Sequence, residues 1–109
     1  MTARLYILQR ATAVLMVPLL IAHLALIFYA TRRGLTAADI LARTRGSWLA
    51  GSAYGVFVAA AAIHAAIGVR TVAAEWAGLA GRRLDLAMWA VGAVLMGLGL
   101  RAVVAVVLP

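Results

Sequence analysis

Three long apolar runs dominate the sequence and limit the folds that it can adopt. Residues 11–31 and 46–69 carry no formal charge, and residues 86–108 carry only Arg101. A helix needs about 20 apolar residues to cross a hydrocarbon core of roughly 30 Å, so each run is long enough to span a membrane. Arg101 lies about two helical turns before the last residue, close enough for its side chain to extend to the membrane surface.

The runs predict an all-α fold, with three transmembrane helices in a single transmembrane anchor domain that covers residues 1–109. The first run is too long for the hydrophobic region of a cleavable signal peptide, which spans about 7–15 residues, and no A-x-A cleavage site follows it. We expect helices at about residues 9–31, 47–72 and 84–108.

The connections between these helices are short. After the Arg32-Arg33-Gly34 stop signal, Thr36-Ala37-Ala38-Asp39 has the pattern of a capping box, which predicts a short interfacial helix over about residues 37–43. Trp48 is placed at the start of the second span, where tryptophan favours the headgroup region. The second connection is expected at about residues 71–83.

Composition and charge agree with a membrane protein. Hydrophobic residues make up 67% of the chain, charged residues 12%, and the net charge is +7. The arginines stand between the apolar runs and not on one solvated face, which argues against nucleic-acid binding. All of them except Arg101 form two sets, of five and four, at opposite ends of the predicted spans, so the positive-inside rule does not set the orientation. The sequence has no cysteine, which excludes disulfides, cysteine-ligated zinc, iron–sulfur clusters and thiol nucleophiles.

His64 is the strongest candidate for chemistry within a span. It lies six residues before Arg70, about 9 Å from that interface, and an ionisable residue at such a depth is a functional-site candidate. Its helical neighbours Ala60, Ala61 and Gly68 are small, and they leave a flat hollow beside the ring that suits a planar macrocycle. The same small residues could instead serve close helix packing, with His64 a hydrogen-bonded core histidine.

His23 stands in a different environment. It lies 13 residues after Arg10, about 20 Å from the interface that Arg10 and Arg70 share, so it is not level with His64. Two axial ligands of one iron must be nearly level, and we therefore expect His23 to form an interhelical hydrogen bond. Its helical neighbours are bulky: Leu19, Leu20, Leu26 and Ile27.

A cationic layer is predicted at the interface near His64. Arg10 begins the first span and Arg70 ends the second, and Glu75 and Trp76 follow on the same side. Each arginine alone is typical of a side chain that extends to the membrane surface. Together they suit an anionic partner such as a haem propionate, or the carbonyl oxygen of a quinone.

The ordered motifs resemble one family. Residues 8–14 (LQRATAV), residues 63–70 (IHAAIGVR) and the pair Glu75-Trp76 together resemble the membrane-anchor subunits of succinate dehydrogenase and fumarate reductase. That family has an arginine and a small hydroxyl residue early in its first helix. A His-x-x-x-Gly turn follows in the second helix, and an acidic–aromatic pair lies beyond it. The three-span length also agrees.

The resemblance implies haem b as cofactor, with His64 as an axial ligand of the iron and Gly68 packed beside the ring. Arg10 would contact a propionate or the quinone, and Arg70 would lie near the propionates. Trp76 falls where the smaller of the two anchor types carries a quinone-binding tyrosine.

Glu75 falls on the aspartate next to that tyrosine, which places it near the quinone site. Gln9 and Tyr6 stand where the larger anchor type has a histidine and a serine, whereas the Gly-Val-Arg after His64 is closer to the larger type, so the anchor type stays open.

The resemblance further implies a set of partners. A companion anchor subunit, or a second copy, would supply the other axial histidine, and iron–sulfur and flavoprotein subunits would carry the dicarboxylate chemistry. The chain itself has no dinucleotide-binding fingerprint and no cysteine for clusters. The expected location is a bacterial-type inner membrane, with a cytoplasmic N-terminus. The alternative is a non-redox structural or assembly subunit of another membrane complex, whose histidines serve only helix packing.

Overall fold

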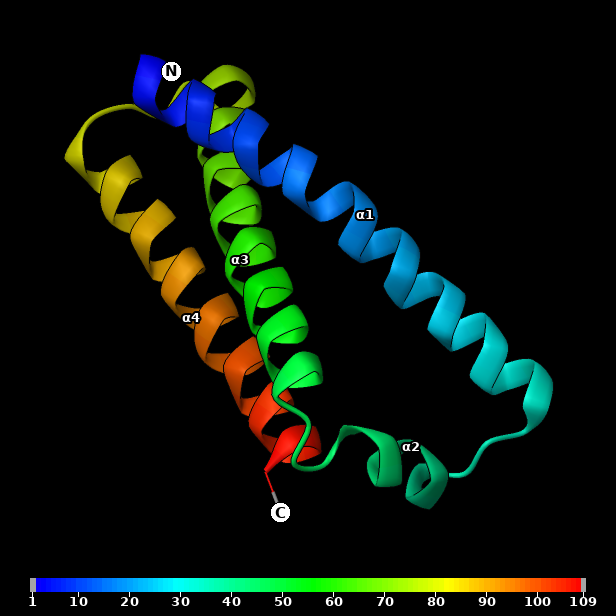
Figure 1. The fold of residues 1–109 in the computed structure, drawn as a ribbon. Coiled ribbons are helices and arrows are strands. Elements are labelled where there is room, and N and C mark those ends of the chain that lie inside the picture. Colours follow the sequence, from blue (N-terminus) through cyan, green and yellow to red (C-terminus); the bar gives the residue numbers. More distant parts are fainter. Residues whose placement is uncertain (1, 109) are drawn as a thin grey trace.

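A computed structural model describes residues 2–108, and the regular structure in this range is entirely helical (Figure 1). Three of the helices are long and apolar enough to cross a membrane. The all-α prediction is therefore confirmed, including the short helix between the first and second spans. The four helices are α1 (Ala3–Arg33), α2 (Ala37–Thr44), α3 (Trp48–Trp76) and α4 (Arg82–Val107).

The helix ends follow local capping signals. Helix α1 begins earlier than predicted because the Thr2 hydroxyl accepts a hydrogen bond from the Leu5 backbone N–H at 3.2 Å. It ends at Arg33, and the following cap residue, Gly34, adopts the left-handed conformation with φ 66°. Helix α2 has the predicted capping box, formed by Thr36 and Asp39.

Helix α3 is longer than the sequence predicts, because it continues to Trp76 instead of ending near residue 72. The segment after Arg70 contains alanines, which are the best helix formers, and no glycine before Gly78. The short loop that remains connects to α4 at Arg82.

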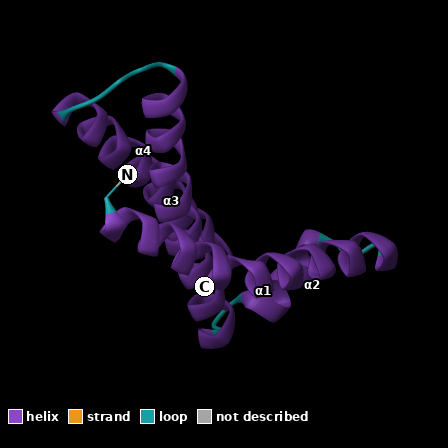
Figure 2. Ribbon diagram, turned by 90° about the horizontal axis from the view of Figure 1, so that it is seen from above, coloured by secondary structure: helices purple, strands orange, loops and turns teal. Residues whose placement is uncertain are grey.

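Helices α3 and α4 form a closely packed pair, and α1 lies against α3 near its own N-terminal end and then diverges from it (Figure 1). Seen from above, α1 and α2 extend to one side of the α3–α4 pair (Figure 2). The far end of α2 returns to this pair. There the Thr44 hydroxyl donates to the Val106 carbonyl at 2.6 Å, and the Gly46 N–H donates to the Val107 carbonyl at 2.7 Å.

Small residues form the contact between α3 and α4. A Cβ at Gly92 would lie 3.3 Å from the Ala66 Cβ, and one at Gly99 would overlap the Val58 side chain. Such small residues let two helix backbones approach closely. The resulting van der Waals packing holds the helices together in lipid, where the hydrophobic effect does not drive their association. Most of each span's surface is uncovered in the single chain, as expected for helices that face lipid or other subunits.

The two sets of arginines lie at opposite ends of the molecule, whose longest dimension is 48 Å. One end holds the start of α1, the end of α3 and the start of α4, and the other holds α2 (Figure 1). The near-equal division seen in the sequence is thus preserved in space.

Candidate functional site

The site centres on a hydrogen bond between two membrane-spanning helices. The Thr12 Oγ1 of α1 lies 3.2 Å from the Nδ1 of His64 on α3. Thr12 is 5% exposed and is the buried polar residue of the described chain. This contact holds the Nδ1 edge of the imidazole against α1, at the point where the two helices meet.

The other hydrogen-bond partners of Thr12 indicate which of the two residues, Thr12 or His64, is the donor in this bond. Its hydroxyl oxygen also lies 2.9 Å from the Leu8 carbonyl oxygen and 3.0 Å from the Gln9 carbonyl oxygen. A hydroxyl has one proton, and a carbonyl can only accept, so that proton is directed to these backbone oxygens. The hydroxyl lone pair then accepts from an N–H at His64 Nδ1. We assign the Nδ1–H tautomer to His64 from this network.

The second ring nitrogen, Nε2, is left with its lone pair. Within residues 2–108 it forms no hydrogen bond, and it is not sealed among protein atoms. An imidazole whose Nδ1–H is held by an oxygen, and whose Nε2 is open, has the arrangement found in metal-ligating histidines.

The small residues around His64 allow α1 to approach α3. A Cβ added at Gly68 would meet the side-chain nitrogen of Gln9 at 3.6 Å, and Ala60 is only 4% exposed. The hollow predicted beside the imidazole is therefore partly covered on the α1 side, by Gln9. The side-chain oxygen of Gln9 is buried without a hydrogen-bond partner among residues 2–108.

Arg70, six residues after His64, is held by an ion pair. Its Nε donates to Asp85 Oδ1 at 2.8 Å, which joins the end of α3 to the first turn of α4. The Arg70 side chain is 18% exposed. Because only Nε is used in this bond, the terminal nitrogens of the guanidinium stay available for another acceptor.

The other predicted site residues lie at the same end of the molecule but on its surface. The Arg10 guanidinium stacks on Tyr6, 5.2 Å from the ring centroid. Trp76 is the last residue of α3 and is 85% exposed, and Glu75 beside it is also exposed. Among the described contacts, these three side chains do not touch His64.

The family model for the succinate dehydrogenase/fumarate reductase transmembrane subunit matches residues 1–105. The chain belongs to this family. It is thus an integral membrane subunit that forms a complex with other subunits of succinate dehydrogenase or fumarate reductase. Searches of curated proteins and of solved structures find no match.

His23 of this transmembrane subunit does not form the predicted interhelical hydrogen bond. Its Nδ1 is buried without a partner among residues 2–108, and its ring instead meets the edges of Tyr54 and Phe57, with centroids 5.8 and 5.6 Å away. Aromatic packing has replaced the expected polar contact. These two residues precede His64 by seven to ten positions, about 10–15 Å along α3, so the two histidines lie at different depths, as the sequence predicts.

Three residues of the site were not predicted as site residues: Thr12, Gln9 and Asp85. The sequence did contain a sign of the role of Thr12, because a hydroxyl in a charge-free span needs hydrogen-bond partners. The carbonyls of its own helix accept its proton, but its oxygen still needs a hydrogen-bond donor from another helix. Gln9 and Asp85 had no signal, since their neighbours come from distant parts of the sequence. No group of three or more His, Cys, Asp or Glu side chains forms a metal site within residues 2–108.

Proposed function

We propose that this chain is the haem b-ligating membrane anchor of a succinate:quinone oxidoreductase, with His64 Nε2 as an axial ligand of the iron. The single observation that carries the proposal is the Thr12–His64 hydrogen bond of 3.2 Å. This bond fixes the orientation and the tautomer of the ring, and it leaves the Nε2 lone pair free to bind a metal. A hydrogen bond of this kind also raises the basicity of the ligating nitrogen.

The residues around His64 fit such a group. Nε2 is not sealed by the chain's own atoms and would be free to hold the group, and a companion anchor subunit or a second copy would hold it from the other side. Gly68 adds no side chain beside the ring, and the hollow there is covered only in part, by the Gln9 side chain of α1. A bound haem b supplies a one-electron carrier whose potential depends on its axial ligands and the charges around it.

Charge near the site comes from two arginines. Arg70 offers its terminal guanidinium nitrogens to a propionate, and Asp85 fixes the direction of the side chain through Nε. Arg10 lies on the exposed side of α1, where it would meet a propionate or a quinone carbonyl oxygen. Both side chains stabilise negative charge at this end of the molecule.

The same end provides a quinone-binding surface. Trp76 presents an indole N–H, which donates a hydrogen bond, and Glu75 lies next to it. The iron–sulfur subunit would dock over these residues, on the cytoplasmic face of a bacterial-type inner membrane, and the flavoprotein subunit would follow it. The dicarboxylate reaction then takes place outside this chain, which contributes ligation, charge and anchoring.

The test compares His64→Ala with His23→Ala in the intact complex. We expect the first variant to lose haem b in a pyridine haemochrome assay and in the reduced-minus-oxidised spectrum, and the second to retain it. Retention of full haem b by His64→Ala would contradict the assignment.

A second candidate function rests on the same hydrogen bond. A histidine held by Thr12 could serve helix packing alone, in a non-redox structural or assembly subunit. In that case the wild-type complex would contain no haem, and His64→Ala would lower its melting temperature.

A further inference from the structure

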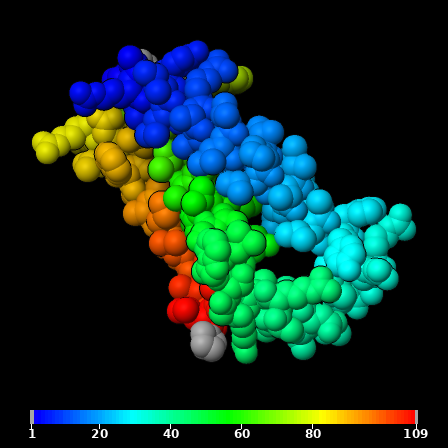
Figure 3. Space-filling view, in the orientation of Figure 1, coloured from blue at the N-terminus to red at the C-terminus, as the bar shows by residue number. Residues whose placement is uncertain are grey.

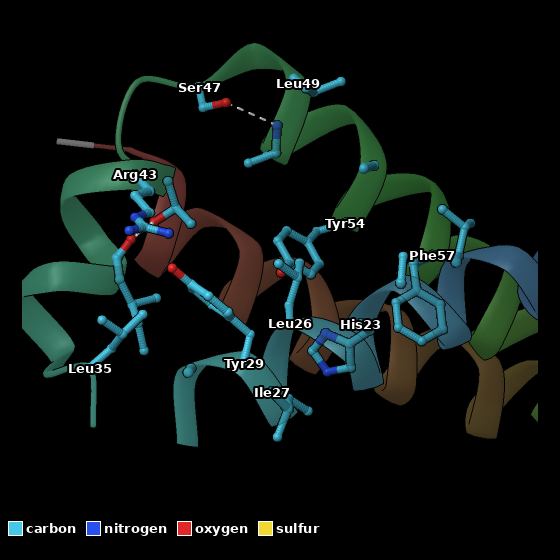
Figure 4. A pocket seen from close by; sticks show the side chains of 17 residues that line it. His23, Leu26, Ile27, Tyr29, Leu35, Arg43, Ser47, Leu49, Tyr54 and Phe57 are labelled. Carbon is cyan, nitrogen blue, oxygen red and sulfur yellow. Dashed lines mark hydrogen bonds between the residues drawn. The ribbon is translucent and has the colours of Figure 1, made fainter. Parts of the chain in front are cut away.

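A cavity of about 500 Å³ lies between the second half of α1, helix α2 and the start of α3 (Figure 4). Its size falls within the range of about 300–1,000 Å³ that small-molecule sites occupy. The space-filling view shows the hollow between α1 and α3, where the two helices have diverged (Figure 3). It is far from His64, in the half of the molecule that holds α2.

One end of the cavity is cationic. Arg43 of α2 lines it, and its guanidinium stacks on Tyr29, 5.8 Å from the ring centroid. Arg33 stacks on the same ring at 5.7 Å. Arg43 has no salt-bridge partner within residues 2–108. Asp39, one turn earlier, uses Oδ2 to accept the Thr36 N–H at 2.8 Å.

The rest of the wall is mostly apolar, with His23 and the hydroxyl side chains of Thr44, Ser47 and Tyr54 as its polar members. The walls are formed by side chains such as Leu19, Leu26, Ile27 and Phe57. His23 lies six residues before Tyr29, about 9 Å deeper along α1. Its Nδ1 is sealed without a partner, and a buried orphan N–H is less favourable than a buried lone pair, which puts the proton on Nε2. His23 thus offers one hydrogen-bond donor below the cationic end.

We propose that this cavity binds one anionic phospholipid from the surrounding leaflet. The phosphate lies on Arg43, an ester carbonyl accepts from His23 Nε2, and an acyl chain covers the apolar wall. Charge, oxygen acceptor and hydrocarbon are then met in the order in which a phospholipid presents them. A net negative charge is favoured because Arg33 and Arg43 both stack on Tyr29 at this end of the cavity. The choline cation of a zwitterionic lipid would be repelled there, and an apolar helix of another subunit would supply no anion for the Arg43 guanidinium.

The test uses the intact complex and matched variants. In Arg43→Gln the cavity loses its charge, whereas Arg45→Gln removes an arginine two positions away that does not line the cavity. Ala53→Phe fills the cavity without changing its charge. Melting temperature shows that each variant is folded.

Each complex is delipidated, reloaded in nanodiscs of phosphatidylglycerol or of phosphatidylcholine, and examined by native mass spectrometry. We expect wild type and Arg45→Gln to retain one phosphatidylglycerol per chain. Arg43→Gln and Ala53→Phe should bind it about tenfold more weakly, which corresponds to 1.4 kcal/mol.

Equal retention of phosphatidylcholine would overturn the proposal, as would equal losses in Arg43→Gln and Arg45→Gln. Displacement of the lipid by inorganic phosphate would assign the site to free phosphate instead. None of these results depends on haem, so the proposal stands or falls separately from that for His64.

Discussion

Replacement of Thr12 by valine isolates the interaction that positions His64. Valine has nearly the same shape as threonine, and Thr12 is 5% exposed, so the change creates no cavity. What it removes is the oxygen 3.2 Å from His64 Nδ1. The imidazole then has an N–H without an acceptor, or it turns and presents a different nitrogen.

The size of the effect follows from two independent estimates. An N–H left without a partner inside a protein costs about 1–3 kcal/mol. Loss of the outer hydrogen bond to a metal-ligating histidine typically lowers metal affinity by about 10–100-fold. A tenfold change corresponds to about 1.4 kcal/mol, so the two ranges agree. Because His64 is only half-buried, we expect the lower end, a loss of about tenfold in haem affinity.

The assay titrates a haem scavenger against the intact complex and measures the haem b that remains. Thr12→Ser keeps the hydroxyl and should retain the wild-type affinity. Thr31→Val is a matched control, because the Thr31 hydroxyl donates to the Ile27 carbonyl of its own helix at 2.8 Å and contacts no histidine. Wild-type affinity in Thr12→Val, or an equal loss in Thr31→Val, would refute the role given to Thr12.

Two further predictions concern the fold. Gly99→Ala should destabilise the complex by about 1–3 kcal/mol through overlap with the β-branched, stiff Val58, whereas Gly97→Ala, with nothing within 4 Å, should be neutral or slightly stabilising; equal melting temperatures would contradict this. Hydrogen bonding to the Thr36 backbone N–H holds the pKa of Asp39 below its usual value, with smaller contributions from the Thr36 hydroxyl and Arg43. The cap of α2 is therefore stabilised above about pH 4 and is lost as the pH falls through the lowered pKa, and hydrogen exchange of α2 should rise there in wild type but not in Asp39→Asn.

Hydropathy and local capping signals predicted most of the fold. The three spans depend on the length of apolar sequence, and helix α2 on the Thr36–Asp39 pair, so both are local properties. The predicted end of α3 was too early, because the alanine-rich segment after Arg70 is compatible with either a helix or a loop. The clear helix-stop residue, Gly78, comes only after Trp76.

The site was predicted less completely, because it depends on where two helices meet. Thr12 and His64 are 52 residues apart, and their contact is set by the packing of α1 on α3, which no periodicity encodes. The same holds for Arg70 and Asp85, whose ion pair joins two helices across a loop. For His23, the bulky neighbours in the sequence indicated a packed environment, but not that the ring would pack edge-to-face with Tyr54 and Phe57 of α3.

The central claim, that His64 Nε2 ligates haem iron, is tested most directly by a cryo-electron microscopy map of the intact complex. We predict density for a planar macrocycle whose iron bonds Nε2, with Nδ1 still on the Thr12 hydroxyl and the opposite ligand supplied by another chain. A map in which protein side chains of a neighbouring subunit cap Nε2, with no macrocycle beside it, would contradict the claim.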